Sequence, residues 1–249
     1  MLRINTIVFP ETIDEAYTLL SKNKKNRVLG GMIWLKMEDI QIPCAIDLSK
    51  LSLDTIEETE EEFKIGAMVT LREMEINEPL NKSFGNVFKD AFKDIVGVQM
   101  RNMATLGGSI YSRFGFSDVI CALLCLECEV ETYKHGRISL EEFTKLDYEQ
   151  DIVEYIYIKK TGLKSAFTCV RNSSTDICTL NASCTKYEDH YKFCIGARPA
   201  IAKVYNCPLD DVSLDVLCGS NMRGSKEYRE KLVEGLVTRL VRKVDGDAC

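Results

Sequence analysis

The sequence predicts an α+β fold in two parts, with the boundary near residue 161. Predicted strands and helices alternate up to that point, short strands joined by tight turns follow it, and a long helix comes last. The chain has 249 residues, of which 45% are hydrophobic and 28% charged. A chain of this size and composition can bury an extensive core without disulfide bonds.

The first segment predicts a helix followed by short strands. Thr12–Glu15 has the spacing of a capping box, and the apolar residues of Ile13–Leu20 recur at helical intervals. Strands are then predicted at 27–29 and 45–48. This order of elements favours a small strand-and-helix lobe.

A second unit begins near Gly66. The acidic run 57–62 lies just before it, between two apolar stretches, and we interpret it as a solvated hairpin turn. Thr70–Glu73 repeats the capping-box spacing, and apolar residues at helical intervals over 84–95 predict a further helix that ends before Gly97. This unit is therefore also mixed.

The next stretch, 98–118, is too long and too rich in glycine and aromatic residues for an ordinary connection, and we predict a functional loop. Ser117 and Asp118 then stand where a helix should begin, ahead of an apolar run. Strands are predicted at 129–133 and 151–159.

Beyond residue 161 the pattern changes. Three strands joined by short turns are predicted at 166–171, 177–187 and 191–195. Helical segments should follow, with a terminal helix over 225–244. This part is predicted to be a small sheet packed against helices.

Composition excludes several classes of function. The net charge of −6 and the lack of a Lys/Arg cluster argue against nucleic acid as a partner. No window is long enough to span a membrane and the first residues do not resemble a signal peptide, so we expect a cytoplasmic protein. Only two histidines occur, and no Rossmann or P-loop motif is present. No catalytic side chain is assigned, which favours chemistry supplied by a cofactor.

The 11 cysteines leave one alternative open. Cys121, Cys125 and Cys128 have the C-x3-C-x2-C spacing with which radical-SAM enzymes hold an iron–sulfur cluster. Their surroundings are apolar throughout and the spacing fits one face of a helix, so we interpret them as core residues and predict no metal ligands. Iron analysis of anaerobically purified protein distinguishes the two interpretations.

Two glycine pairs are the best indication of function. Gly30-Gly31 and Gly107-Gly108 each follow a short apolar run and open a polar or aromatic segment. Glycine lets a ligand approach the backbone closely, and consecutive N–H groups in such turns form a nest for an anion. Two such pairs suggest a long ligand that contains phosphate.

The segments around these pairs resemble the FAD-binding (medium) subunit of the molybdenum hydroxylases, the xanthine dehydrogenase and carbon monoxide dehydrogenase family. The most specific match is RNMATLGGSI followed by FSDVICALLCLEC, and VLGGMIWLKM resembles the first flavin loop of the family. PETIDEAYTLL, FKIGAMVTLREME, AFTCVRNSSTDICTLNAS and GSKEYREKLVEGLVTRL extend the resemblance along most of the chain.

The resemblance implies a fold and a division into domains. Residues 1–161 should form a two-lobed α+β flavin-binding domain of the PCMH type, with lobes at about 1–55 and 56–161. Residues 162–249 should form a three-stranded antiparallel sheet with helices.

It also implies a set of FAD-binding residues. The first loop should wrap the diphosphate through Arg27, Val28, Leu29, Gly30, Gly31, Met32, Ile33 and Trp34. The second wall should consist of Ala104, Thr105, Gly107, Gly108 and Ser109. Ile110 and Tyr111 are expected beside the isoalloxazine ring, where they would gate access of nicotinamide, and Asp118 should hydrogen-bond the sugar region of the cofactor. Thr168 stands where some relatives have a lysine near the flavin.

In function, the resemblance implies an oxidoreductase subunit. A large molybdopterin-binding subunit would hydroxylate the substrate, a small subunit with 2Fe–2S clusters would relay electrons, and the FAD of this chain would pass them to NAD or another acceptor. The alternative is a non-enzymatic assembly subunit that has kept the fold but no longer binds FAD. Equimolar flavin in the purified protein excludes that alternative.

Overall fold

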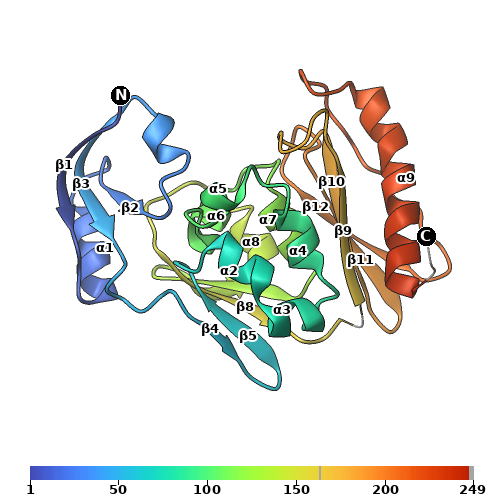
Figure 1. The fold of residues 1–249 in the computed structure, drawn as a ribbon, viewed down its shortest axis with the longest axis horizontal. Helices are drawn as coiled ribbons and strands as arrows, with labels where there is room; N and C mark the ends of the chain where they lie inside the picture. The colour runs from blue at the N-terminus through green and yellow to red at the C-terminus, as the bar shows by residue number, and fades with distance from the viewer. Residues whose placement is uncertain (163, 247–249) are drawn as a thin grey trace.

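The computed structural model describes residues 1–162 and 164–246 and contains three β-sheets that follow one another from the N-terminal to the C-terminal side of the molecule (Figure 1). The strands of the first sheet come from residues 3–47, those of the second from 56–159 and those of the third from 164–208. The mixture of helices and sheets confirms the predicted α+β class. The division into domains at residue 161 stays a prediction.

The first sheet is parallel and three-stranded, in the order β1-β3-β2. Its elements are β1 (Arg3–Val8), α1 (Ile13–Ser21), β2 (Arg27–Leu29), the 3-10 helix η1 (Leu35–Met37) and β3 (Gln41–Asp47). Thr12 caps α1 as predicted, because its Oγ1 accepts a hydrogen bond from the Glu15 amide at 3.2 Å. Ala16 and Leu20 of this helix are buried with Ile46 of β3. Strand β1 was not predicted, and parallel pairing with β3 orders it.

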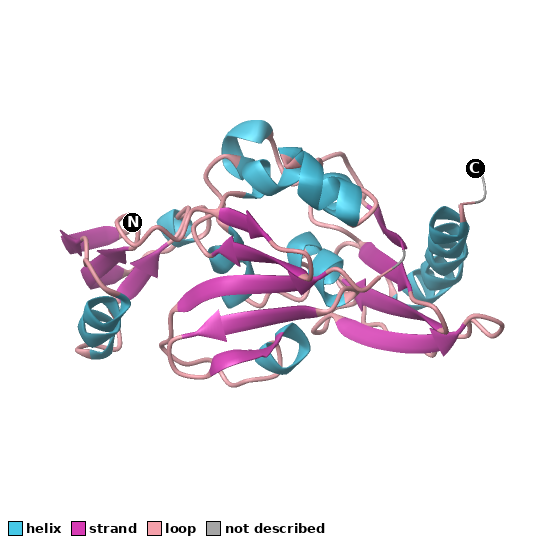
Figure 2. Cartoon of the chain, turned by 90° about the horizontal axis from the view of Figure 1, so that it is seen from below, coloured by secondary structure: helices cyan, strands magenta, loops and turns pink. Residues whose placement is uncertain are grey.

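The second sheet is antiparallel and five-stranded, in the order β4-β5-β8-β6-β7. Its strands are β4 (Ile56–Glu58), β5 (Glu62–Gly66), β6 (Cys128–Thr132), β7 (Gly136–Ser139) and β8 (Val153–Lys159). Short helices connect them: α2 (Leu71–Ile76), α3 (Glu78–Ser83), α4 (Val87–Phe92), α5 (Val98–Arg101), α6 (Leu106–Tyr111), α7 (Asp118–Leu124) and α8 (Leu140–Phe143). The acidic run turns between β4 and β5, as predicted. Figure 2 shows these strands from below, relative to the view of Figure 1.

Two predictions for this region need correction. The helix predicted over 84–95 is confined to α4, because Gly85 and Asn86 adopt φ of 63° and 64°, a left-handed conformation that separates α3 from α4. The loop predicted over 98–118 contains the two short helices α5 and α6, so the second glycine pair lies inside a helix. Thr105 caps α6 by accepting a hydrogen bond from the Gly108 amide at 3.3 Å, which stabilises a helical turn through the glycines.

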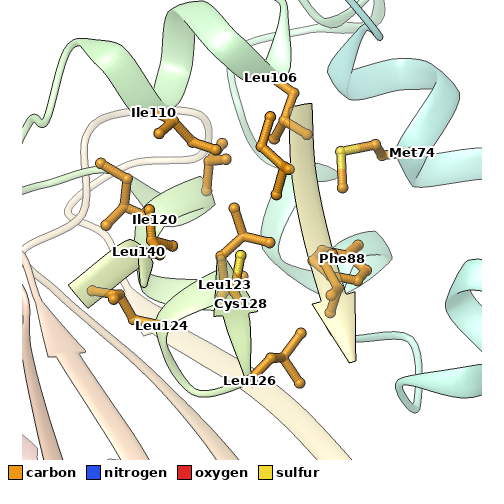
Figure 3. Packing of buried hydrophobic residues seen from close by; sticks show 14 of the residues in the cluster. Met74, Phe88, Leu106, Ile110, Ile120, Leu123, Leu124, Leu126, Cys128 and Leu140 are labelled. Atoms are coloured by element: carbon orange, nitrogen blue, oxygen red, sulfur yellow. The ribbon is translucent and has the colours of Figure 1, made fainter. Parts of the chain in front are cut away.

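The cysteine cluster belongs to the core of this sheet, as predicted, although not on one helix. Cys121 and Cys125 are fully buried, α7 ends at Leu124, and Cys128 lies in β6 close to Leu123 (Figure 3). Burial raises the pKa of the Cys125 thiol to about 11 and raises those of Cys121 and Cys128 as well, so the thiolates that ligate iron are disfavoured. Among the residues with described coordinates, no cluster of three or more His, Cys, Asp or Glu could hold a metal ion.

The third sheet is antiparallel, in the order β12-β11-β10-β9, and helix α9 covers one face. These elements are β9 (Lys164–Val170), β10 (Leu180–Lys186), β11 (His190–Gly196), β12 (Lys203–Pro208) and α9 (Lys226–Asp245). The antiparallel sheet and the terminal helix agree with prediction. Strand β12 adds a fourth strand, and residues 209–224, where helical segments were expected, contain no helix.

Residues 209–224 are organised around the fully buried Arg229 of α9. Its guanidinium donates hydrogen bonds to the carbonyls of Thr179, Gly219 and Gly224 and to Asn221 Oδ1, at 2.5–2.8 Å. A buried cation is tolerated when its donors are all satisfied, so this side chain ties the irregular segment to the sheet. In the two described ranges no helix combines the length and the apolar character that crossing a membrane requires.

A buried ion pair fixes α2 against α5. Arg101 donates from Nε to Glu75 Oε2 at 2.7 Å, Arg72 approaches the same carboxylate at 3.0 Å, and Glu75 and Arg101 are both buried. Burial alone would raise the pKa of Glu75, but its hydrogen bonds and charge interactions with the two arginines outweigh this and lower the pKa.

We expect Glu75→Gln to lower the free energy of unfolding by about 3 kcal/mol at pH 7, because the buried Arg101 loses its counter-charge. Since the pKa of Glu75 is lower in the folded state, the stabilisation is present above the ordinary value of 4.5 and is lost as the pH falls through the folded-state pKa. Urea unfolding at pH 7 and pH 4 measures the difference. Glu141→Gln, in an exposed pair with Lys145, is the control and should cost less than about 1 kcal/mol. Equal losses in the two variants would contradict the prediction.

Candidate cofactor site

A cavity of about 730 Å³ lies between the first two sheets and reaches the third. Most of the residues that line it belong to four stretches, within 26–35, 104–119, 148–153 and 171–177. They come from the loop after β2, from α6 and the start of α7, from the approach to β8, and from the loop after β9. Its volume falls in the range of cofactor and small-molecule sites.

The two glycine pairs meet at this cavity. A Cβ atom at Gly30 would lie 2.6 Å from Oγ1 of Thr105, and one at Gly31 would lie 1.8 Å from the carbonyl oxygen of Met103. The loop after β2 therefore packs directly on the backbone that leads into α6. Gly31 makes room for this backbone contact, in addition to any ligand.

The first loop presents free backbone donors. Across the described part of the chain, no hydrogen bond engages the amides of Gly31, Met32, Ile33 and Trp34. Met32 has φ of 56°, so its backbone is left-handed, and alternation of hand makes successive N–H groups converge. All four residues line the cavity. The arrangement is that of an anion-binding nest.

The second glycine pair uses its amides internally. The Gly107 amide donates to the Ala67 carbonyl at 2.8 Å, and the Gly108 amide donates to Thr105 Oγ1 at 3.3 Å. Ser109 donates from its amide to the Thr105 carbonyl. A Cβ atom at Gly108 would meet only Thr105 Oγ1, at 3.0 Å. This pair therefore offers a wall without side chains, and donors to an anion come from the first loop.

Aromatic rings join the two loops at the rim of the cavity. Phe114 and Phe116 stack with their centroids 5.0 Å apart, and Trp34 meets Phe114 edge-on at 5.4 Å. All three rings line the cavity, and Trp34 is half exposed. They form an apolar surface beside the nest that suits contact with a planar ring.

The segment 148–151 forms a further wall that the sequence did not reveal. Tyr111 donates from its hydroxyl to the Glu149 carbonyl at 2.5 Å. Gln150 donates from Nε2 to three carbonyls of the first lobe, those of Leu20, Asn23 and Asn26. The segment is thus tied to both lobes. No sequence motif in this segment indicates that it lines the cavity, because each of its contacts joins residues far apart in the sequence.

Asp118 begins α7 behind the N-cap residue Ser117, as predicted, and lies at the cavity wall. Its carboxylate is 2.5 Å from Arg171 Nη2 and 2.6 Å from Asn181 Nδ2, and the thiol of Cys178 donates to it at 3.1 Å. Sequence reasoning assigned Asp118 but missed Arg171, because the two residues are 53 positions apart. Only the fold brings them together.

Comparison with known proteins identifies the family. The model of the FAD-binding domain in molybdopterin dehydrogenases matches residues 3–159, more than half of the chain. The chain belongs to this family. The resemblance of the glycine motifs to FAD-binding subunits is thereby confirmed, and FAD is the cofactor of the family. A comparison with curated protein sequences gives no significant match.

Solved structures similar to this FAD-binding subunit extend the fold over its whole length. The Cu,Mo-CO dehydrogenase in its cyanide-inactivated form is 19% identical, with a TM-score of 0.84 and 100% of both chains covered. Quinoline 2-oxidoreductase from Pseudomonas putida 86 is 16% identical, with a TM-score of 0.83, covering 97% of this chain and 96% of that one. Carbon monoxide dehydrogenase from Hydrogenophaga pseudoflava, lacking the Mo-pyranopterin moiety, is 17% identical, with a TM-score of 0.82 and 99% of both chains covered.

Most residues that the family resemblance assigned to FAD line the cavity of this subunit. They are Arg27, Val28, Leu29, Gly30, Gly31, Met32, Ile33, Trp34, Ala104, Thr105, Gly107, Gly108, Ser109, Tyr111 and Asp118. The nest of free amides suits the diphosphate, and the lack of a Cβ at Gly30 and Gly108 lets the two loops meet around Thr105 at the cavity wall. By these observations the residues present fit FAD.

Two assigned residues do not line the cavity. Ile110 is fully buried, one helical turn after Leu106, and its side chain belongs to the core cluster drawn in Figure 3. Thr168 pairs with Ala182, and strand alternation places both on the face that α9 covers. From the third sheet, the residues that line the cavity are Arg171, Thr175, Asp176 and Ile177.

Proposed function

We propose that this FAD-binding subunit transfers electrons within a multisubunit molybdenum hydroxylase. Electrons would come from 2Fe–2S clusters of a small partner subunit, after a molybdopterin-binding large subunit has oxidised the substrate. NAD is the proposed acceptor, and the assembly is proposed to be cytoplasmic. The observation that supports this most strongly is the nest of unpaired amides at 31–34, which opens on the cavity in a chain of this family.

Within this proposal, the residues of the chain bind and orient the cofactor. The amides of 31–34 would hold the diphosphate, and the glycine surfaces would set its distance from the backbone. The aromatic residues Trp34, Phe114 and Phe116 would exclude water along one side. Bound FAD supplies the redox chemistry. The chain would control it through hydrogen bonds, packing and access, which agrees with the absence of an assigned catalytic side chain.

The enzyme class is proposed at the level of the family. The solved structures of similar fold are carbon monoxide dehydrogenases and a quinoline 2-oxidoreductase. At 16–19% identity they support the fold, while the substrate depends on the large partner subunit. We therefore propose a molybdenum hydroxylase subunit without narrowing it to xanthine dehydrogenase.

The primary test is the flavin content of the purified chain. We expect about one FAD per chain, measured from the absorbance of flavin released by denaturation. A chain that remains colourless after incubation with excess FAD would support the assembly-subunit alternative and contradict the proposed function. Co-purification of the chain from its native source, with metal analysis of the complex, tests the proposed partners.

Tyr111 provides a test of nicotinamide access. We expect Tyr111→Ala to change the rate at which NADH reduces the bound flavin by several-fold, with little change in FAD content, because the side chain lines the cavity and its hydroxyl is tied to the 148–151 segment. Stopped-flow absorbance with NADH and with NADPH measures the rate. Tyr111→Phe, which keeps the ring and loses only the hydroxyl, is the matched control. Equal rates in all three proteins would remove the gating role, and reduction by neither nucleotide would point to another acceptor.

A further inference from the structure

A buried ion pair joins the wall of the FAD cavity to the third sheet. Asp118 begins α7, in the region that matches the FAD-domain family, and Arg171 follows β9. Arg171 Nη2 lies 2.5 Å from Asp118 Oδ2, and the two side chains are only 9% and 6% exposed. Both residues line the cavity. The pair therefore stands at the junction of the sheet and the cofactor site.

The carboxylate of Asp118 has one acceptor position left. Its Oδ1 accepts from Asn181 Nδ2 at 2.6 Å and from the Cys178 thiol at 3.1 Å, which uses both lone pairs of that oxygen. Its Oδ2 accepts from Arg171, and no other residue in the described ranges 1–162 and 164–246 donates to it, so one lone pair of Oδ2 stays available. All three donors follow residue 161 in the sequence. The third sheet thus determines how the carboxylate is oriented at the cavity wall.

Arg171 is itself held in place. Its Nη1 donates to the carbonyl of Asp176 at 2.5 Å, and the side chain of Asp176 pairs with Arg223 at 3.0 Å. Arg171 can therefore act as a fixed support for Asp118. Arg223 also contacts Asp176 but does not line the cavity, so its substitution serves as a control.

We propose that Arg171 is a positioning residue for FAD, acting through Asp118. Arg171 holds the Asp118 carboxylate so that the available lone pair of Oδ2 accepts a hydrogen bond from a hydroxyl of the cofactor. Its positive charge also neutralises this carboxylate beside an anionic ligand. Without the guanidinium, a buried carboxylate would face the negatively charged cofactor uncompensated, and both its desolvation and the repulsion would oppose binding. This inference rests on the proposed function, because it requires that FAD occupies the cavity.

The test is a double-mutant cycle on the full chain, with two readouts. Apo-protein of wild type, Arg171→Gln, Asp118→Asn and the double variant is titrated with FAD by quenching of flavin fluorescence, which yields Kd. Differential scanning calorimetry of the apo-proteins yields Tm. We expect Arg171→Gln to raise Kd at least tenfold. The double variant should bind FAD more tightly than Arg171→Gln alone, because removing the carboxylate charge removes the repulsion.

Two further variants separate positioning from structural support. Arg171→Lys keeps the positive charge and should recover part of the affinity, and it replaces Arg171→Gln if that variant does not fold. Arg223→Gln breaks the ion pair between Arg223 and the Asp176 carboxylate and should leave Kd unchanged. A wild-type Kd in Arg171→Gln with a lowered Tm would overturn the proposal and assign the pair to stability alone. A double variant that binds FAD no more tightly than Arg171→Gln would overturn the proposal as well.

This outcome is distinct from failure of the proposed function. If wild-type apo-protein does not take up FAD, the site assignment itself is wrong, and the inference about Arg171 falls with it. If wild type binds FAD and the cycle shows no coupling, the proposed function stands and only the role of Arg171 is overturned.

Discussion

Gly31→Ala is expected to lower the free energy of unfolding by at least about 3 kcal/mol and to abolish FAD retention. The added Cβ would lie 1.8 Å from the Met103 carbonyl oxygen and 2.9 Å from the Cα of Ala104, so two backbone segments must separate. Overpacking costs of about 1–3 kcal/mol apply where side chains can adjust, and a backbone clash exceeds that range. Urea unfolding and the flavin content of the purified variant measure both effects.

Gly235→Ala is the matched control for this substitution. Gly235 lies within α9, and a Cβ there meets nothing within 4 Å. Alanine in a helix interior is more favourable than glycine, so this variant should gain about 0.5–1 kcal/mol and keep its flavin. If Gly31→Ala were as stable as wild type, the close packing of the two loops would be wrong.

Gly108→Asp should lose FAD while the chain stays folded. A Cβ at this position meets only Thr105 Oγ1, at 3.0 Å, so a small shift of one side chain accommodates it. The carboxylate, however, would enter the wall of the cavity beside the proposed diphosphate. Two like charges about 4 Å apart repel by roughly 4 kcal/mol near a protein surface, which corresponds to a loss of affinity of about a thousandfold.

Flavin content and Tm, measured together, test this second expectation. We expect less than about a tenth of the wild-type flavin and a Tm within a few degrees of wild type. Gly108→Asn has nearly the same shape without the charge, so its flavin content separates electrostatic repulsion from steric exclusion. A yellow, flavin-loaded Gly108→Asp protein would contradict the placement of the diphosphate between the two glycine pairs.

Local signals in the sequence predicted local structure well. The capping spacings at Thr12 and Thr70 begin helices where expected, since each cap depends on residues only three positions apart. The strand at 27–29 and the hairpin around the acidic run follow from equally short patterns. The glycine pairs were recognisable because few other residues permit such close backbone approach.

Features that depend on distant contacts were not predictable in the same way. Strand β12 is ordered by pairing with β11, and its own sequence, KVYNCP, has little strand periodicity. The role of Arg171 exists only because the third sheet brings it to Asp118. Tyr111 and Glu149 are likewise 38 positions apart. One expectation for the second glycine pair was wrong, namely that its amides are free to bind an anion. The Thr105 cap makes this segment helical, and its amides donate within the protein.

The covering of the third sheet by α9 has a consequence for synthesis on the ribosome. The apolar residues of β9, β10 and β11 that face α9 share one core cluster with this helix and with the irregular segment 209–224, and α9 is the last of these parts to be translated. Domains generally fold as units during synthesis, and the ribosome adds about 5–20 residues per second. Strands β9, β10 and β11 therefore leave the ribosome seconds before α9, the helix that packs on them. A nascent chain stalled before Lys226 would hold an open apolar sheet, the form in which this subunit should be most dependent on chaperones.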